Sequence, residues 1–253
     1  DKMNLFDLTG RKAIVTGGSR GLGHAMAEGL LEAGCEVCIV SGSERVIAAA
    51  EEYRMRGLPC CWVRADLRSE RQAAACIAQC EAALGGTAQI LVAAHGIQRR
   101  GLAEDFPLET WDEVMQVNLR SVFALCQQAA KRMIPQKYGK IILISSMSAF
   151  FGGTKIPAYA VSKAGVTELA KALNNEWLPH GINVNCLAPG FMATDMCADL
   201  QKSDQNENIL RRIPAGRWGT PQDMKGPCVF LASDASNYLG GAVIPVDGGY
   251  LVG

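Results

Sequence analysis

Seven short apolar stretches alternate with segments in which apolar residues have helical spacing, and this alternation constrains the fold most. We expect strands at Lys12–Thr16, Glu36–Ser41, Pro59–Arg64, Gln89–Ala93, Lys140–Ser145, Asn183–Ala188 and Ala242–Val246. We expect helices at Gly21–Ala33, Glu44–Arg56, Glu70–Leu84, Trp111–Lys137, Tyr159–Pro179, Asp204–Arg212 and Pro221–Ala232. Continuous apolar strands between helices indicate a parallel sheet that is covered on both faces. Because crossovers between parallel strands are right-handed, residues 1–253 are predicted to form a single α/β domain, doubly wound, with a seven-stranded parallel sheet and helices on both faces.

A glycine-rich turn, Gly17–Gly23, joins the first expected strand to the first expected helix. Gly17 and Gly21 allow tight backbone turns, and Gly23 lets the helix pack close to the sheet. The N-terminus of a helix offers free N–H groups to a pyrophosphate. The strand before the turn and the helix after it therefore predict a phosphate cradle, with an ordinary strand-to-helix turn as the alternative.

Tyr159 and Lys163 are four residues apart in a segment with helical spacing, so both side chains face one side of the helix. A cation beside a phenol lowers the pKa of the phenol, which ordinarily lies near ~10. A tyrosine of this kind can pass a proton to or from a substrate oxygen near neutral pH. Without further motifs, such a pair is more often an ordinary feature of a surface helix.

The composition excludes several classes of protein. Lys+Arg 25 balance Asp+Glu 25 for a formal net charge of +0, and no basic run occurs, so we expect no nucleic-acid partner. No apolar stretch approaches the ~18 residues that a membrane span needs, and the N-terminus lacks a secretory apolar region, so we expect a cytoplasmic protein with no membrane partner. The 10 cysteines lack the spacing of zinc ligands, and we expect small apolar core residues and no metal site.

Further motifs follow the expected strands along the whole chain. They are Thr16-Gly17-x-x-x-Gly21-x-Gly23, Asp66-Leu67, Asn118, Ser146, Tyr159-x-x-x-Lys163, Pro189-Gly190 and Asp247-Gly248-Gly249. With these motifs the chain resembles the short-chain dehydrogenase/reductase family over essentially its full length. The resemblance implies a Rossmann-type domain that binds NAD(P) and an oxidoreductase that acts on a CH–OH group.

The resemblance also assigns roles to residues. Tyr159 is implied to be the general acid/base on the substrate oxygen, and Lys163 to lower its pKa and bind the nicotinamide ribose. Ser146, thirteen positions before Tyr159, is implied to hold the substrate oxygen, and Asn118 to kink its helix and anchor a water that links Lys163 to solvent. The expected cofactor contacts are Gly17, Ser19, Arg20, Gly21, Leu22, Gly23, Ser41, Ser43, Asp66, Leu67, Gly96, Tyr159, Lys163, Pro189, Gly190 and Thr194.

The stretch Ala93-Ala94-His95-Gly96 departs from the family, which usually has Asn-Asn-Ala-Gly at this point. Both amides are missing, so their usual hydrogen bonds to neighbouring strands are in doubt, whereas Gly96 keeps the backbone close to the cofactor. His95 either replaces a lost hydrogen bond or faces the nicotinamide and the substrate. Of these two roles, the sequence favours the structural one.

The end of the second expected strand bears on the choice between NADP and NAD. NAD-specific members of the family usually have an acid there, whereas this chain has Ser41. Arg20 is similar to the basic residue of NADP-using members, and Ser41 and Ser43 could donate hydrogen bonds to a 2′-phosphate. NADP is therefore favoured, and NAD stays open because no Arg follows Ser41 and the sugar-acid relatives named next often use NAD.

Several stretches resemble the gluconate 5-dehydrogenase and 2-dehydro-3-deoxy-D-gluconate 5-dehydrogenase group of this family. They are Leu5–Gly10, Gln98–Arg100, Asn175–Trp177 and Arg212–Gly219. The resemblance implies a sugar-acid substrate, whose carboxylate Arg99 and Arg100 are candidates to bind, although contact with solvent or another subunit is an equal alternative. Ser146, Tyr159 and His95 complete the expected substrate contacts, and the polar, irregular segment at about 190–215 is expected to be a substrate lid.

Two other functions stay open. The same core serves reductases of acyl-thioester carbonyls and of steroid ketones, and a chain that had lost catalysis would be a cofactor-binding sensor. The helices expected at Trp111–Lys137 and Tyr159–Pro179 have wide apolar faces, so we expect a homodimer or homotetramer. These faces contain Val122, Phe123, Leu125, Val166, Leu169 and Leu173.

Overall fold

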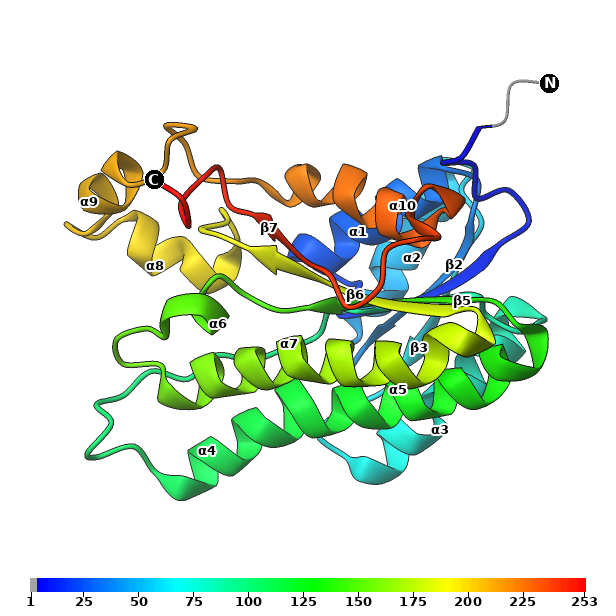
Figure 1. Ribbon diagram of the computed structural model, residues 1–253, viewed down its shortest axis with the longest axis horizontal. Coiled ribbons are helices and arrows are strands. Elements are labelled where there is room, and N and C mark those ends of the chain that lie inside the picture. The colour runs from blue at the N-terminus through cyan, green and yellow to red at the C-terminus, as the bar shows by residue number, and fades with distance from the viewer. Residues whose placement is uncertain (1–3) are drawn as a thin grey trace.

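The structure, a computed structural model, describes residues 4–253 and shows them as a seven-stranded sheet between two layers of helices (Figure 1). The strand order is β3-β2-β1-β4-β5-β6-β7, and each neighbouring pair is parallel. The strands are β1 Lys12–Thr16, β2 Glu36–Ser41, β3 Cys60–Arg64, β4 Ile90–Ala93, β5 Gly139–Ile144, β6 Ile182–Pro189 and β7 Val243–Val246. The predicted fold class is confirmed, and β1 and β2 begin and end where the sequence predicts.

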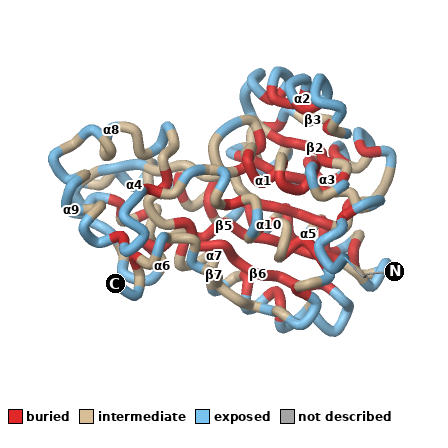
Figure 2. The backbone as a smooth tube through the Cα atoms, turned by 90° about the horizontal axis from the view of Figure 1, so that it is seen from above, coloured by how far each residue is buried: buried red, intermediate tan, exposed pale blue. Residues whose placement is uncertain are grey.

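Helices cover both faces of the sheet (Figure 1), and the buried backbone is concentrated in the strands of the sheet (Figure 2). Two separate apolar cores lie between the sheet and these helices. One face carries α1 Gly21–Glu32, α2 Arg45–Met55 and α10 Lys225–Ala232, and the other carries α3 Glu70–Leu84, α5 Ser121–Met133 and α7 Pro157–Trp177. Successive strand residues alternate between the two cores, as Ile14 and Val15 do. The strands are therefore apolar on both sides, which is why they read as continuous apolar runs in the sequence.

The long helix expected at Trp111–Lys137 is interrupted near its middle. Helix α4 (Leu108–Met115) leads into a π-helical turn, η1 (Gln116–Arg120), before α5 begins at Ser121. Asn118 lies inside this turn, at the point where a kink is expected from the sequence. Single π-helical turns of this kind occur frequently at functional sites.

The segment between β6 and β7 contains three short helices, two in the stretch expected to be irregular and one within the helix predicted at Asp204–Arg212. They are η4 Asp195–Cys197, α8 Ala198–Gln201 and α9 Asn206–Arg211. Apolar side chains order this region, because Ile213 packs in a small buried cluster with Met147 and Tyr250. The indole N–H of Trp218 also donates to Asn206 Oδ1 at 2.8 Å. The remaining short elements are η2 Ile134–Gln136, α6 Ser148–Phe151, η3 Leu178–His180, η5 Pro221–Met224 and η6 Asp234–Ser236.

Across residues 4–253, every helix is either too short or too polar to pass through a lipid bilayer.

Candidate active site

The expected site residues converge at the carboxyl ends of the central strands. The glycine-rich turn follows β1, His95 and Gly96 follow β4, Ser146 follows β5, and Gly190 follows β6. In open parallel sheets, ligands bind beyond these strand ends, and here the strand order reverses between β1 and β4. The sheet therefore brings residues from distant parts of the sequence to one edge.

The glycine-rich turn is shaped so that side chains would block it. Gly17 has a φ of 69°, and a Cβ on it would come within 3.0 Å of the Ala94 carbonyl group. A Cβ on Gly23 would overlap the carbonyl oxygen of Gly17, which explains why α1 packs so closely on the turn. Because α1 begins at Gly21, its first free N–H groups face this bare backbone, and the turn fits a dinucleotide pyrophosphate.

Tyr159 and Lys163 lie together on α7, as their spacing predicts. The ammonium nitrogen of Lys163 is 5.7 Å from the centroid of the Tyr159 ring. Lys163 is only 5% exposed, and its Nζ donates to the Ile144 carbonyl oxygen at 2.7 Å. Burial lowers the pKa of Lys163 to about 8.

The pKa of Tyr159 moves opposite to the direction expected from its neighbour. Burial raises the pKa of the phenol to about 12, and a hydrogen bond with Ser146 opposes this rise. The expectation that Lys163 lowers this pKa was wrong for this structure, because burial dominates and the ammonium is directed to the Ile144 carbonyl. Tyr159 is therefore protonated at neutral pH and can act as a proton donor.

Ser146 is oriented to donate a hydrogen bond towards Tyr159. Its Oγ accepts hydrogen bonds from the Ser148 N–H at 3.1 Å and from the Ser148 hydroxyl at 3.0 Å. A hydroxyl has one hydrogen and two lone pairs, so the Ser146 hydrogen stays available for a phenol or a substrate oxygen. Ser145, by contrast, is buried and bonded to the Lys163 carbonyl and the Thr167 hydroxyl.

Asn118 is fully buried and all its amide groups are bonded. Its Oδ1 accepts from the Ile97 N–H at 2.8 Å, and its Nδ2 donates to the Ile97 carbonyl at 2.9 Å and to Ser162 Oγ at 3.0 Å. A Cβ on Gly96 would lie 3.3 Å from Asn118 Oδ1 and 3.5 Å from Lys163 Nζ, so these three residues meet at one point. Sequence reasoning missed Ser162, and no pattern in the sequence indicates it.

Both ring nitrogens of His95 have partners within the protein. Nδ1 lies 2.7 Å from the Thr16 hydroxyl, and Nε2 lies 2.7 Å from the Ser121 hydroxyl. Burial and the charge of Lys163 lower the pKa of His95 to about 3, so the ring is neutral at physiological pH. These contacts support the structural one of the two roles left open for His95, whereas contact with a substrate stays a prediction.

The protein is expected to lose stability in acid partly through His95. The unfolded chain binds a proton on this histidine near pH 6.5, whereas the folded chain does so only near pH 3. Between these values the unfolded state binds more protons, so the free energy of unfolding falls as the pH falls. We expect the melting temperature of wild-type protein to fall more steeply between pH about 7 and about 4 than that of His95→Asn. His180→Asn, a change at an exposed histidine, should follow the wild-type curve; parallel curves for wild-type and His95→Asn would contradict the prediction.

A row of hydroxyl groups stands beside the cradle at the end of β2. Ser19 Oγ donates to Ser41 Oγ at 3.0 Å, and Ser41 Oγ lies 3.4 Å from Ser43 Oγ. Asp66, after β3, is paired with Arg68 at 2.8 Å, and this hydrogen-bonded pair lowers the pKa of the Asp66 carboxyl. The neighbouring Leu67 side chain belongs to the buried core, which leaves its backbone at the strand end.

The segment after β6 contacts the cradle directly. Arg20 Nη1 lies 3.0 Å from Asp195 Oδ2, an ion pair that sequence reasoning missed. Thr194 Cγ2 would be 3.9 Å from a Cβ on Gly21, and Gly190 packs against Asp247 so closely that a Cβ would not fit. The expected lid and the expected cofactor cradle are therefore in contact.

The two arginines after β4 differ in their surroundings. Arg99 Nη2 is paired with Glu113 Oε1 at 3.0 Å. Within residues 4–253, Arg100 has no carboxylate within ion-pair distance. Burial raises the pKa of the Cys197 thiol in the segment after β6, and the positive charge of Arg100 opposes this rise.

Comparisons with known proteins agree with this site. Residues 17–251 match a family model described as enoyl-(acyl carrier protein) reductase. The chain is 44% identical to 2-dehydro-3-deoxy-D-gluconate 5-dehydrogenase of Dickeya dadantii, over 98% of each chain. It is 36% identical to gluconate 5-dehydrogenase of Gluconobacter oxydans, again over 98% of each chain. The crystal structure of a gluconate 5-dehydrogenase from Burkholderia cenocepacia in complex with NADP and tartrate has a TM-score of 0.95 and 36% identity, and the match covers 99% of this chain and 98% of the other.

Proposed function

The chain belongs to the short-chain dehydrogenase/reductase family, and from this premise we propose that it is an NADP-dependent oxidoreductase for a sugar acid. It interconverts a secondary alcohol and a ketone on a substrate of the gluconate or keto-deoxygluconate type. The observation that carries this proposal is the convergence of Ser146, Tyr159 and Lys163 beside a dinucleotide cradle. Relatives that are 36% and 44% identical to this chain are named for dehydrogenation at position 5 of such acids.

The residues of the site divide the work of carbonyl reduction among them. The bound nicotinamide supplies the hydride for this reaction. Tyr159, protonated at neutral pH, donates a proton to the substrate oxygen, and Ser146 donates a hydrogen bond to the same oxygen. Lys163 would bind the nicotinamide ribose of the cofactor. The Asn118 amide holds the backbone of Ile97 in place through two hydrogen bonds. Alcohol oxidation is the reverse of this reaction, and in it the Tyr159 phenolate, which forms when the phenol loses its proton, accepts the proton of the substrate hydroxyl.

Arg100 is the better candidate to bind the substrate carboxylate. Arg99 already has Glu113 as its partner, whereas Arg100 has no acidic partner among the described residues and its charge acts on Cys197 in the segment after β6. Guanidinium and carboxylate groups match in shape and form paired hydrogen bonds. The tartrate bound by the relative from Burkholderia cenocepacia is itself a hydroxy acid.

A spectrophotometric screen tests the proposed function. Gluconate, 5-ketogluconate, 2-deoxygluconate and 3-deoxy-2-keto acids are offered with NADP(H) and with NAD(H), and absorbance of the reduced nicotinamide is followed. We expect turnover with at least one sugar acid and much weaker turnover with a neutral keto sugar of the same chain length. Turnover of an acyl thioester alone would favour the activity named in the family model, and no absorbance change with any substrate would favour a sensor.

The preference for NADP rests on Arg20 and the hydroxyl row. No carboxylate stands at Ser41 to repel a 2′-phosphate, and the Ser19, Ser41 and Ser43 hydroxyls lie within 3.4 Å of their neighbours in the row. Arg20 extends from the cradle with its side chain 64% exposed and pairs with Asp195. Since an exposed ion pair contributes little free energy, a phosphate can replace Asp195 as the partner of Arg20.

Arg20→Gln is expected to raise the dissociation constant of NADPH about 10-fold or more, because a charged hydrogen bond contributes ~1.5–3 kcal/mol. Binding of NADH should change little, so the ratio of the two constants reports the effect. Asp195→Asn should lower the dissociation constant of NADPH, because it removes the carboxylate that competes with the 2′-phosphate for Arg20. Arg211→Gln, at an arginine paired with Glu207 in α9, is the control. An unchanged ratio in Arg20→Gln would assign the 2′-phosphate to other residues.

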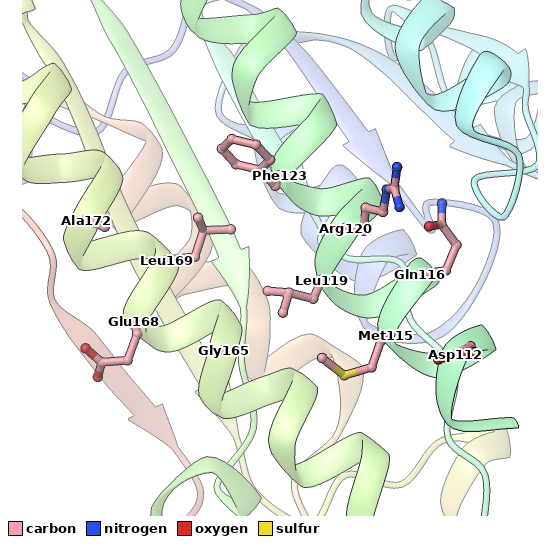
Figure 3. Close-up of a pocket in the computed structure, with 10 residues that line it drawn as sticks. All are labelled: Asp112, Met115, Gln116, Leu119, Arg120, Phe123, Gly165, Glu168, Leu169 and Ala172. Carbon is pink, nitrogen blue, oxygen red and sulfur yellow. The ribbon is translucent and has the colours of Figure 1, made fainter. Parts of the chain in front are cut away.

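We further propose that the protein is a homodimer or homotetramer. An apolar groove of about 830 Å³ runs between α7 on one side and α4, η1 and α5 on the other (Figure 3). Leu119, Phe123 and Leu169 line it, with Asp112, Arg120 and Glu168 among its polar lining residues. Val122, Leu125, Val166 and Leu173, which the sequence grouped with this face, are instead buried inside the protomer.

The exposed apolar groove suits a second copy of the chain. Two-fold interfaces are self-complementary, and large exposed apolar patches mark interaction sites. Phe123→Asp is expected to halve the mass in sedimentation velocity, so that a dimer becomes a 27.0 kDa monomer or a tetramer becomes a dimer. Met55→Asp, at an 88% exposed apolar residue on α2, should keep the wild-type mass. An unchanged mass in Phe123→Asp would place the interface elsewhere.

We also propose a cytoplasmic location. All ten cysteines are free thiols, and most of them are buried in the two cores. Unpaired thiols persist in reducing compartments, whereas oxidising compartments favour disulfides.

A further inference from the structure

A continuous chain of hydrogen bonds runs from the end of β1 to the start of α5. The Thr16 hydroxyl lies 2.7 Å from His95 Nδ1, and His95 Nε2 lies 2.7 Å from the Ser121 hydroxyl. Ser121 in turn donates to the Val117 carbonyl oxygen at 2.7 Å. Thr16 is 0% exposed and Ser121 is 1% exposed, so solvent does not compete for these bonds. This series of hydrogen bonds joins the end of β1, the segment after β4 and the start of α5, which are far apart in the sequence.

The bonds of Ser121 fix the direction of the chain. Its single hydrogen goes to the Val117 carbonyl, so its oxygen must accept from His95, and His95 must carry its proton on Nε2. The Nδ1 lone pair then accepts from Thr16, whose other acceptor, the Val92 carbonyl, is more distant at 3.4 Å. Thr16 Oγ1 also accepts from the Ala94 N–H at 3.2 Å. Each side-chain hydrogen of Thr16, His95 and Ser121 thus has one acceptor when His95 is the neutral Nε2–H tautomer.

The first end of the chain lies at the cofactor cradle. Thr16 is the last residue of β1, and Gly17, the first residue of the glycine-rich turn, follows it directly. A Cβ on Gly17 would come within 3.0 Å of the His95 backbone, so the turn packs on the residue whose ring forms the chain. A shift of His95 would therefore displace the backbone on which the dinucleotide rests.

The second end lies at the π-helical turn that holds Asn118. In this turn the Ser121 N–H bonds the Gln116 carbonyl, five residues back, so it does not bond the Val117 carbonyl as in an α-helix. The Ser121 hydroxyl bonds Val117 instead, and the residue after Val117 is Asn118. Lys163, which meets Asn118 at Gly96, is the charged group that acts on the His95 ring.

We propose that His95 is a positioning residue, which as the neutral Nε2–H tautomer holds the cofactor cradle and the Asn118–Lys163 side of the site at a fixed separation. The proposal rests on the proposed function, because its effect is on hydride transfer between a cofactor and a substrate on these two sides. Small displacements of reacting groups cost as much as ~10²-fold in rate. His95 itself touches neither reacting atom, so substrate affinity is not its contribution.

Two variants of Thr16 test the chain with shape held constant. Thr16→Val removes the hydroxyl and keeps the shape, whereas Thr16→Ser keeps the hydroxyl. In single-turnover stopped-flow oxidation of NADPH, Thr16→Val and His95→Ala are expected to slow the rate constant about 10- to 100-fold, and Thr16→Ser is expected to stay near wild-type. The amplitude reports the folded fraction, so a purely structural role would lower the amplitude and leave the rate constant unchanged. That result would overturn the proposal.

A double variant tests whether the groups act as one unit. Thr16→Val combined with Ser121→Ala should be no slower than the slower single variant, because either change alone interrupts the chain. If the losses in rate constant of the two single variants multiply in the double variant, the groups do not act through one series of hydrogen bonds and the proposal is overturned. Ser233→Ala is the control, because Ser233 is equally buried and donates to the Phe230 carbonyl at 2.9 Å away from the strand ends.

The tautomer can be tested without a substrate. Nitrogen-15 NMR of wild-type protein labelled at histidine, with His95→Asn used to assign the signal, should show His95 protonated on Nε2 alone at pH about 6 to 8. An Nδ1–H tautomer or a charged ring in this range would overturn the proposal. If no sugar acid is turned over, the proposed function fails, and the NMR result still decides the role of His95.

Discussion

Tyr159→Phe is expected to lower kcat for sugar-acid reduction about 10²- to 10⁴-fold, the range that a positioned general acid contributes. The change removes the Tyr159 hydroxyl, which burial keeps protonated at neutral pH and which forms a hydrogen bond with Ser146. The ring stays in place, so the dissociation constant of NADPH and the melting temperature should match those of the wild-type protein. Steady-state kinetics with the best substrate of the screen measure the effect.

Tyr238→Phe is the matched control, because Tyr238 is fully exposed and lies outside the site. Its kinetics should equal those of the wild-type protein. Turnover near the wild-type rate in Tyr159→Phe would show that another group donates the proton, and the proposed mechanism would have to be abandoned.

Lys163→Met is expected to lower kcat/KM about 10²- to 10³-fold, the cost of removing one preorganised charged donor from a site that excludes water. Methionine fills a similar volume but removes the ammonium that donates to the Ile144 carbonyl and faces the Tyr159 ring. Because Lys163 is also expected to bind the nicotinamide ribose, the dissociation constant of NADPH should rise in parallel. Fluorescence titration with NADPH measures that second effect.

Lys171→Met is the control on the same helix. Lys171 lies two turns further along α7, is about half exposed and pairs with Glu168 at 2.6 Å. Its removal should leave kcat/KM and NADPH binding unchanged. Equal kinetics in the two lysine variants would remove Lys163 from the mechanism.

The sheet could be predicted from the sequence because strands buried on both faces leave uninterrupted apolar runs. The helix at Trp111–Lys137 was predicted as continuous, since apolar spacing alone does not reveal the turn at Asn118. That turn depends on bonds between the Asn118 amide and Ile97, a residue on another segment. After β6 the helix α9 was predicted, whereas η4 and α8 were not, because they lie in polar sequence in a region that the packing of Ile213 and Tyr250 stabilises.

The identity of the site residues was easier to predict than their electrostatics. Spacing placed Tyr159 beside Lys163, but the pKa of the phenol depends on how much protein surrounds it, and this burial outweighed the expected effect of the cation. The partner of Arg20 is Asp195, a residue far along the chain that no local pattern indicates. Likewise, the two missing amides at Ala93 and Ala94 pointed to a lost bond, but only the structure shows Ser121 as a partner of His95.

The reversal of strand order between β1 and β4 has a consequence for how such a protein can change over time. The segments that follow β1 to β3 contain the residues expected to set the coenzyme preference, Arg20, Ser41 and Ser43, whereas the segments that follow β4 to β6 contain those expected to contact the nicotinamide and the substrate. Selection on one half can therefore proceed while the other is left largely intact. A change of coenzyme preference and a change of substrate range should therefore need separate sets of substitutions. The residues between β1 and β4, where the two halves meet, should tolerate the fewest substitutions.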